Sequence, residues 1–227
     1  QTVSEGDTLV VAVGAIDPDG VGVTLSAESL PANADFVDNG DGTGGLTFGP
    51  DFTQSGTYNI AIIAFDGVLA DSETVAIEVT EVDRVPVLAA VGPQSIAEGD
   101  SLVIDVSASD PDGDSLVLSA EDLPVNANFV DNGDGTGTLT FTPDFTQEGA
   151  YDLTFVASDG VLADSEVVTI TVTGVNRAPE LASIGSQSVF EGDTLTVDVS
   201  ASDPDAGTLT LSVTNLPVNA GFSDNGD

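Results

Sequence analysis

An internal repeat is the feature that most constrains this chain. Gln1, Gln94 and Gln187 stand 93 residues apart and open the similar segments QTVSEGDTLVV, QSIAEGDSLVI and QSVFEGDTLTV. A unit of this length suits one compact domain. The sequence therefore predicts two complete repeats, 1–93 and 94–186, followed by the N-terminal part of a third, 187–227. We expect such a chain to be a segment of a longer tandem array.

The apolar residues within each repeat alternate with polar ones, which is the pattern of half-buried β-strands. In the second repeat this alternation covers 102–108, 151–157 and 168–172, with Gly-rich and Asp-rich turns between the strands. About seven short strands with regularly spaced turns are typical of an immunoglobulin-like sandwich. The predicted fold is all-β, a tandem of Greek-key β-sandwiches, with the recurring phenylalanines and tyrosines in the cores.

The composition excludes several classes of function. The chain has 39 acidic residues against two arginines, no lysine, no histidine and no cysteine, for a formal net charge of −37. Without histidine or cysteine, the common nucleophile–base pairs and thiolate metal sites cannot form. A surface this negative repels phosphate backbones and anionic lipids, so neither nucleic-acid binding nor membrane insertion is expected. Cations are the favoured partners.

Acidic residues recur in phase at the expected strand ends. They stand in the EGD, DPD, PDFTQ, and FDG or SDG motifs of the two complete repeats, and the first two of these motifs recur in the third. In an extended segment, residues i and i+2 point the same way, so each DPD presents two carboxylates on one side. Carboxylates gathered in this way repel one another unless a cation lies among them, and calcium prefers six to eight oxygen ligands. By contrast, DNGDGTG lacks the distal Glu of a calcium loop and is typical of a hairpin turn.

The motifs AEGD, VSASDPDGD, YDLTFVASDG and ITVTGVNRAP follow one another in the order seen in cadherin repeats. The chain resembles this family, and more closely the bacterial cadherin-like and immunoglobulin-like repeats of large surface proteins. The resemblance implies extracellular sandwiches with calcium bound where consecutive repeats meet. It assigns Glu5, Asp51, Asp83, Asp110, Asp112 and Asp159 to the first junction, and Glu98, Asp144, Asn176, Asp203 and Asp205 to the second. By the same logic Asp17, Asp19 and Asp66 would face a preceding repeat.

The linkers depart from the family pattern and leave an alternative open. Arg84 and Arg177 stand where the family places an Asn ligand, and Thr53 and Thr146 stand where it places a Glu. A guanidinium can hold two carboxylates and replace part of a metal ion's role. The junctions are therefore expected to contain calcium, an arginine–carboxylate contact, both together, or simply a flexible linker.

These features predict a non-enzymatic structural repeat, a calcium-stiffened rod in a cell-surface adhesin or filament. Its partners would be neighbouring repeats of the same chain, and at an unseen tip a surface protein or glycan. Two alternatives remain open at this point. The chain could be the subunit of a fibre in which copies of itself exchange strands, or a spacer or binding module in a secreted multidomain protein.

Overall fold

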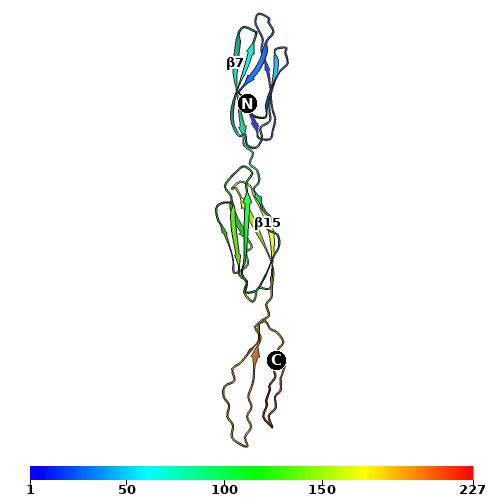
Figure 1. Cartoon of the computed structure of the whole chain (residues 1–227), viewed down its shortest axis with the longest axis vertical. Helices are drawn as coiled ribbons and strands as arrows, with labels where there is room; N and C mark the ends of the chain where they lie inside the picture. The colour runs from blue at the N-terminus through cyan, green and yellow to red at the C-terminus, as the bar shows by residue number, and fades with distance from the viewer. Residues whose placement is uncertain (227) are drawn as a thin grey trace.

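The computed structural model describes residues 1–226 and consists of three bodies joined end to end along one axis (Figure 1). The first two bodies are complete β-sandwiches, which confirms the predicted all-β, immunoglobulin-like fold class. The described residues form no helix, and so none long and apolar enough to cross a bilayer.

The first repeat is built from seven strands in two facing sheets. One sheet has the order β1-β7-β6-β3 and the other β2-β5-β4. All neighbouring strands are antiparallel except β1, which runs parallel to β7. The strands are β1 (Thr2–Ser4), β2 (Leu9–Gly14), β3 (Thr24–Glu28), β4 (Ala34–Asp38), β5 (Thr43–Phe48), β6 (Gly56–Phe65) and β7 (Ala70–Thr80).

The second repeat has the same architecture, with sheets β9-β15-β14-β11 and β12-β13-β10-β8. Its turns match the sequence expectation, since DNGDGTG joins the antiparallel strands β12 and β13 as a hairpin. The strands are β8 (Val87–Leu88), β9 (Gln94–Ala97), β10 (Leu102–Ser109), β11 (Val117–Glu121), β12 (Ala127–Asp131), β13 (Thr136–Phe141), β14 (Gly149–Ser158) and β15 (Ala163–Thr173).

Strand β8 places the start of the second sandwich before Gln94. Its residue Leu88 pairs with Ala108 of β10 and is buried in the second core. The backbone amides of Leu88 and Val91 also donate hydrogen bonds to Asp164 and Glu166 of β15. The segment that follows the linker is therefore the first strand of the next repeat.

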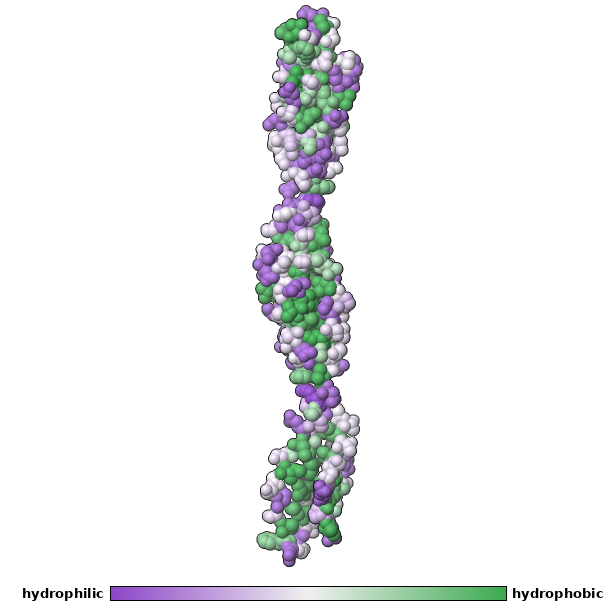
Figure 2. All heavy atoms as spheres, in the orientation of Figure 1, coloured by the Kyte–Doolittle hydropathy of each residue, from purple (hydrophilic) through white to green (hydrophobic). Residues whose placement is uncertain are grey.

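Each core lies between its two sheets. It is filled by the side chains that point inward, which come from every second residue along the strands. In the second repeat Leu139, Phe141, Leu153 and Phe155 are fully buried. The outward residues of the same strands are exposed; Val103, for example, retains 58% of its accessible surface. The third body, after Arg177, contains the short strands β16 (Glu180–Leu181) and β17 (Ala201–Ser202), and many of its apolar side chains are exposed (Figure 2).

The core assignment predicts a specific loss of stability in the second repeat. Leu139→Ala should lower its free energy of unfolding by about 2–5 kcal/mol, because a cavity replaces a fully buried side chain. Val103→Ala, on the outward face, should change it by less than about 0.5 kcal/mol. The fluorescence of Tyr151 during urea unfolding, in a Tyr58→Phe background, reports on this repeat alone. Equal losses for the two variants would contradict the assignment.

Candidate functional site

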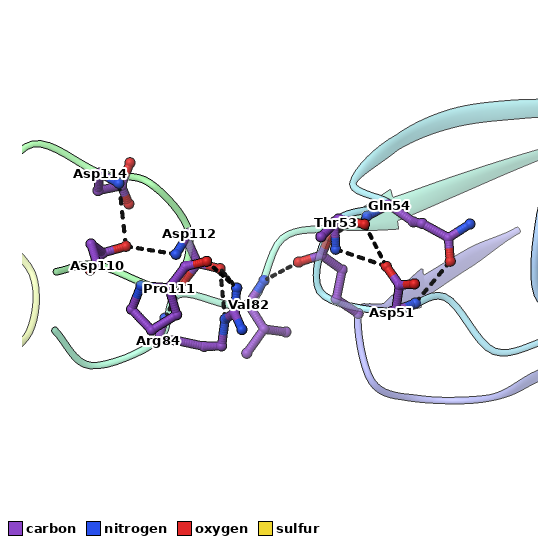
Figure 3. Close-up of polar contacts among 10 residues, drawn as sticks. Asp51, Thr53, Gln54, Val82, Arg84, Asp110, Pro111, Asp112 and Asp114 are labelled. Carbon is purple, nitrogen blue, oxygen red and sulfur yellow. Dashed lines mark hydrogen bonds and ion pairs between the residues drawn. The ribbon is translucent and has the colours of Figure 1, made fainter. Parts of the chain in front are cut away.

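The linker between the first two repeats is held by a single arginine. The backbone amide of Arg84 donates to Oδ2 of Asp112 at 2.8 Å, and its Nε donates to Oδ1 of the same carboxylate at 2.7 Å. Its Nη2 lies 2.6 Å from Oδ1 and also donates to the carbonyl of Pro111. One linker residue thus binds the DPD loop of the second repeat through both its backbone and its side chain (Figure 3).

The same guanidinium lies on an aromatic ring of the first repeat. Cζ of Arg84 is 4.9 Å from the ring centroid of Phe52, the phenylalanine of the PDFTQ turn. The ring in turn covers Gly6 of the EGD motif, where an added Cβ would lie 3.0 Å from the Phe52 ring. Gly6 also has φ +78°, a conformation that favours glycine. We call the Phe52–Arg84–Asp112 unit the arginine clasp, because it joins the two repeats across the linker.

The second linker repeats this clasp. Arg177 binds Asp205 through its backbone amide and through Nε at 2.9 Å, and donates to the carbonyl of Pro204. Its Cζ lies 4.8 Å from the ring centroid of Phe145, which covers Gly99. The recurrence of all these contacts shows that the clasp is a property of the repeat and not of one linker.

The glutamates of the first two EGD motifs hold the start of the linker that follows their repeat. Glu5 is 4% exposed and accepts hydrogen bonds from the backbone amides of Gln54 and Val82. Glu98 is 7% exposed and accepts from the amide of Val175. Both carboxylates thus bind a backbone amide of the linker that follows their repeat, and Glu5 also binds one of its own repeat.

The aspartate of each PDFTQ motif caps a turn. Oδ1 of Asp51 accepts from the amide and hydroxyl of Thr53, at 3.0 and 2.7 Å. Asp144 does the same with Thr146, at 2.9 and 2.6 Å. These bonds lower the pKa of both carboxyl groups, the hydroxyl contributing most. Figure 3 shows the Asp51 turn on one side of the linker and the Asp110–Asp114 loop on the other.

Three carboxylates at the first junction each have a buried oxygen without a partner. Oδ2 of Asp83, Asp110 and Asp159 is buried and accepts no hydrogen bond. The other oxygen of Asp110 accepts from the amides of Asp112 and Asp114, and that of Asp159 accepts from Val161 and Leu162. These turn contacts fix two of the three carboxylates. The unpartnered oxygens come from three separate segments: the linker, the DPD loop and the SDG turn.

The electrostatics show that these groups repel one another. Burial raises the pKa of Asp83, and the charges of Asp159, Asp114, Asp110 and Asp112 raise it further. The pKa of Asp112 is lowered instead, first by its hydrogen bond with the Arg84 side chain. The clasp therefore compensates Asp112, whereas Asp83 faces uncompensated negative charge.

The remaining predicted ligands lie at corresponding turns. Asp203 accepts from the amide of Asp205, and the Asn176 side-chain amide donates to the Arg177 carbonyl. At the far end of the first repeat, Asp17 and Asp66 accept backbone amides within their own loops, from Asp19 and from Val68 and Leu69. Asp19 is exposed in the same loop.

No three acidic side chains of residues 1–226 are gathered in an arrangement that holds a metal ion. The fit of a cation at the first junction thus depends on the three unpartnered oxygens, because buried polar atoms normally have a partner. Carboxylate oxygens are the ligands that calcium prefers. The residues left to hold such an ion would be Asp83, Asp110 and Asp159, each through its unpartnered Oδ2, whereas Glu5, Asp51 and Asp112 bind donors within the protein.

Sequence reasoning missed the aromatic half of the clasp. Phe52 and Phe145 were expected in the cores, but each is 40% exposed and lies under an arginine. The two phenylalanines recur with the same 93-residue spacing as the two linker arginines, and this shared spacing is the sequence signal that could have paired them. Alternation could not reveal it, because PDFTQ lies in a turn. Asp114, whose charge raises the pKa of Asp83, was missed as well.

Comparison with known families identifies the central repeat. Residues 83–173 match the family model described as Bacterial Ig domain. The matched segment begins in the linker before β8 and ends with β15, so it spans the second sandwich. The resemblance to bacterial immunoglobulin-like repeats is thereby confirmed for this repeat.

Two curated relatives span much longer proteins. Chitinase A of Pseudoalteromonas piscicida is 34% identical over 133 residues, which cover 57% of this chain and 16% of that protein. Integrin beta-like protein A of Dictyostelium discoideum is 24% identical over 196 residues, covering 76% of this chain and 10% of that protein. The chain thus spans less than a fifth of either relative.

Among solved structures, similar chains include human protocadherin-24 EC1-2, with 18% identity and a TM-score of 0.46, covering 77% of this chain and 94% of that one. The endo-fucoidan hydrolase MfFcnA4 of glycoside hydrolase family 107 has 24% identity and a TM-score of 0.37, covering 77% and 28%.

The clasp predicts that the geometry of arginine, beyond its charge, orders the first junction. Spin labels on cysteines at the exposed positions Thr57 and Ser119 can measure this order, since the chain has no cysteine of its own. Arg84→Lys should broaden the distance distribution, because lysine lacks the planar fork that binds Asp112 and covers Phe52. Arg177→Lys is the matched control and should leave this pair unchanged. A distribution that stays narrow in Arg84→Lys would refute the clasp.

The Asp144 turn predicts a shift in titration. Thr146→Val removes the hydroxyl that lowers the pKa of Asp144. The pKa of Asp144 should therefore rise toward the usual value of about 3.9. A lowered pKa stabilises the fold above the unfolded-state pKa, and this contribution is lost as pH falls through the folded-state pKa. In the variant, this pH-dependent contribution to stability should be smaller. Carboxyl NMR titration checks this, with Asp51 as the control in the same molecule; a shift of both groups would count against the assignment.

Proposed function

We propose that this chain is a non-catalytic, extracellular spacer whose repeats form a rod, in a cell-surface adhesin or filament or a secreted protein. The rod is held at each joint by the arginine clasp and stiffened at the first joint by calcium. Immunoglobulin-like domains serve as structural or binding modules, and bacterial ones are typically extracellular. The unpartnered oxygens of Asp83, Asp110 and Asp159, beside an intact clasp, are the observation that carries the calcium element.

The shape of the chain supports the spacer role. The sandwiches follow one another along a single axis, with narrow connections between them (Figure 1). Hydrophilic residues gather at these narrow connections (Figure 2). A joint of this kind bends freely unless specific contacts cross it, since only a short segment connects the two bodies. The clasp supplies such contacts, because Phe52 belongs to one repeat and Asp112 to the next.

The charge of the joint supports the cation. Five carboxylates, those of Asp83, Asp110, Asp112, Asp114 and Asp159, act on this region against the one guanidinium of Arg84. The guanidinium of Arg84 already binds Asp112 through Nε and Nη2, so its charge compensates that carboxylate first. A divalent cation held by Asp83, Asp110 and Asp159 would supply two positive charges and would be coordinated by the oxygens that accept no hydrogen bond.

The two roles are complementary. The clasp sets which faces of the repeats oppose each other, because a planar fork on a ring and a carboxylate restricts rotation as well as distance. The cation would remove the repulsion that pushes Asp83 of the linker away from the loops of the second repeat. Without it the joint keeps its clasp but contains mutually repelling carboxylates.

A second setting is favoured by one comparison. The similarity to Chitinase A of Pseudoalteromonas piscicida, 34% over 133 residues, covers a small part of that protein. A spacer of this type would also separate a catalytic domain from other domains in a secreted enzyme.

The proposal predicts that calcium lengthens and stiffens the particle. In small-angle X-ray scattering, adding millimolar Ca²⁺ to chelator-treated protein should increase the maximum dimension, because repulsion at the joint is relieved. Mg²⁺ should do so less, since it prefers a rigid octahedral shell and holds its waters tightly. Scattering curves that coincide with and without Ca²⁺ would contradict the calcium element. Oligomers at all concentrations would contradict a simple spacer.

A further inference from the structure

We infer that the peptide bonds after Arg84 and Arg177 are cleavage sites for an arginine-specific protease of the trypsin type, and that each arginine clasp masks its own site. The chain has two arginines and no lysine, so these are the two bonds in its sequence that such a protease can cut. Cleavage consumes one water; the arginine gains a carboxylate, and Val85 or Ala178 gains an amino group. The clasp, and not the calcium of the proposed function, carries this masking.

The first linker by itself has the properties of a protease substrate. Residues 81–86 belong to no strand, and Val85, which follows the arginine, is exposed. Exposed irregular segments are preferred sites of cleavage, because a protease binds its substrate as an extended strand. Proline stands only at the second position after the arginine, as Pro86, so it does not form the bond to be cut. Protection of this bond therefore depends on contacts outside the linker.

The clasp holds the side chain that the protease has to take up. A trypsin-type protease places the arginine in a pocket with an aspartate at its base. At the first joint the guanidinium of Arg84 instead binds Asp112, through Nε at 2.7 Å and Nη2 at 2.6 Å, and lies over the ring of Phe52. The pocket can receive this side chain only after both contacts are broken.

The backbone of the linker is held as well (Figure 3). The amide of Arg84 donates to Asp112 at 2.8 Å, and the amide of Val82 donates to the buried carboxylate of Glu5 at 3.3 Å. A substrate that docks as an added strand has to offer its backbone amides to the protease. These two amides, at the cleavage site and two residues before it, already have acceptors on either side of the joint.

The second joint masks its arginine in the same way. Arg177 binds Asp205 through its backbone amide and Nε, and lies over Phe145. The amide of Val175, two residues before, donates to Glu98. The two arginine side chains are also exposed to nearly the same extent, 31% and 32%. We therefore expect similar protection at both joints.

The clasp thereby links the order of a joint to its cleavage. A protected bond is cut from a transiently open state, so with fast opening and closing the cleavage rate follows the population of that state. The segments 1–83 and 85–176 contain neither arginine nor lysine, so a cut at a joint releases whole sandwiches. A joint that is bent or pulled open would become the breaking point, and the protease would shed the array repeat by repeat.

Limited digestion of the full chain with trypsin, in the presence of chelator and followed by mass spectrometry, tests the masking. Asp112→Asn should accelerate the cut after Arg84 at least about tenfold, because it removes the charge-assisted bonds of the clasp. The cut after Arg177 in the same molecule should keep its wild-type rate. Asp114→Asn is the matched control: it removes the same charge from an exposed side chain of the same loop, leaves the contacts of Arg84 in place, and should not accelerate the cut.

Two further variants make the test independent of Asp112. Phe52→Leu removes the ring on the other side of the clasp and should also accelerate the cut after Arg84, whereas Asp205→Asn should accelerate only the cut after Arg177. A glutamate-specific protease verifies that the sandwiches stay folded, because glutamates such as Glu28 and Glu78 lie within strands.

Three results would overturn the inference. Wild-type cleavage after Arg84 as fast as in Asp112→Asn would show an unmasked site. Equal acceleration by Asp114→Asn would show that local charge, and not the clasp, governs the cut. Bonds that resist trypsin in every folded variant would show that these linkers are not protease sites at all.

Discussion

A guanidinium lying between an aromatic ring of one repeat and a carboxylate of the next is the contact on which this architecture depends. Arg84 reaches both sides of its linker, lying over Phe52 and binding Asp112. A chain with a net charge of −37 has only two such cations, and both are placed at the joints. Elsewhere the acidic surface keeps the repeats apart, so end-to-end order depends on these two residues.

The recurring motifs become intelligible as parts of this contact. Glu5 holds the PDFTQ turn and the start of the linker, and Gly6 leaves space for the ring of Phe52. Asp51 caps the turn that carries this ring. Much of the acidic pattern is thus structural. Asp83, Asp110 and Asp159 each retain one oxygen without a partner, and the position of these oxygens beside the clasp is the basis of the proposed cation sensitivity of the joint.

The fold could be predicted from the sequence because period-two alternation and turn residues determine it locally. Hence the sandwiches and the hairpin between β12 and β13 agree with expectation. The candidate site was harder to predict from the sequence. The family resemblance grouped Glu5 and Asp51 with Asp110, but each has its own backbone or hydroxyl donors. Which oxygen of a carboxylate has a donor depends on loop geometry, and the exposure of Phe52 depends on a turn, so the alternation of polar and apolar residues reveals neither.

The central claim is that each joint combines an arginine clasp with, at the first linker, carboxylates that require a cation. Crystals grown with calcium and measured at a wavelength where calcium scatters anomalously test it most directly. The expected result is an anomalous peak within about 2.3–2.6 Å of oxygens from Asp83, Asp110 and Asp159, with Arg84 still on Phe52 and Asp112. A map without such a peak, with these carboxylates in solvent and Arg84 detached from both partners, would contradict it.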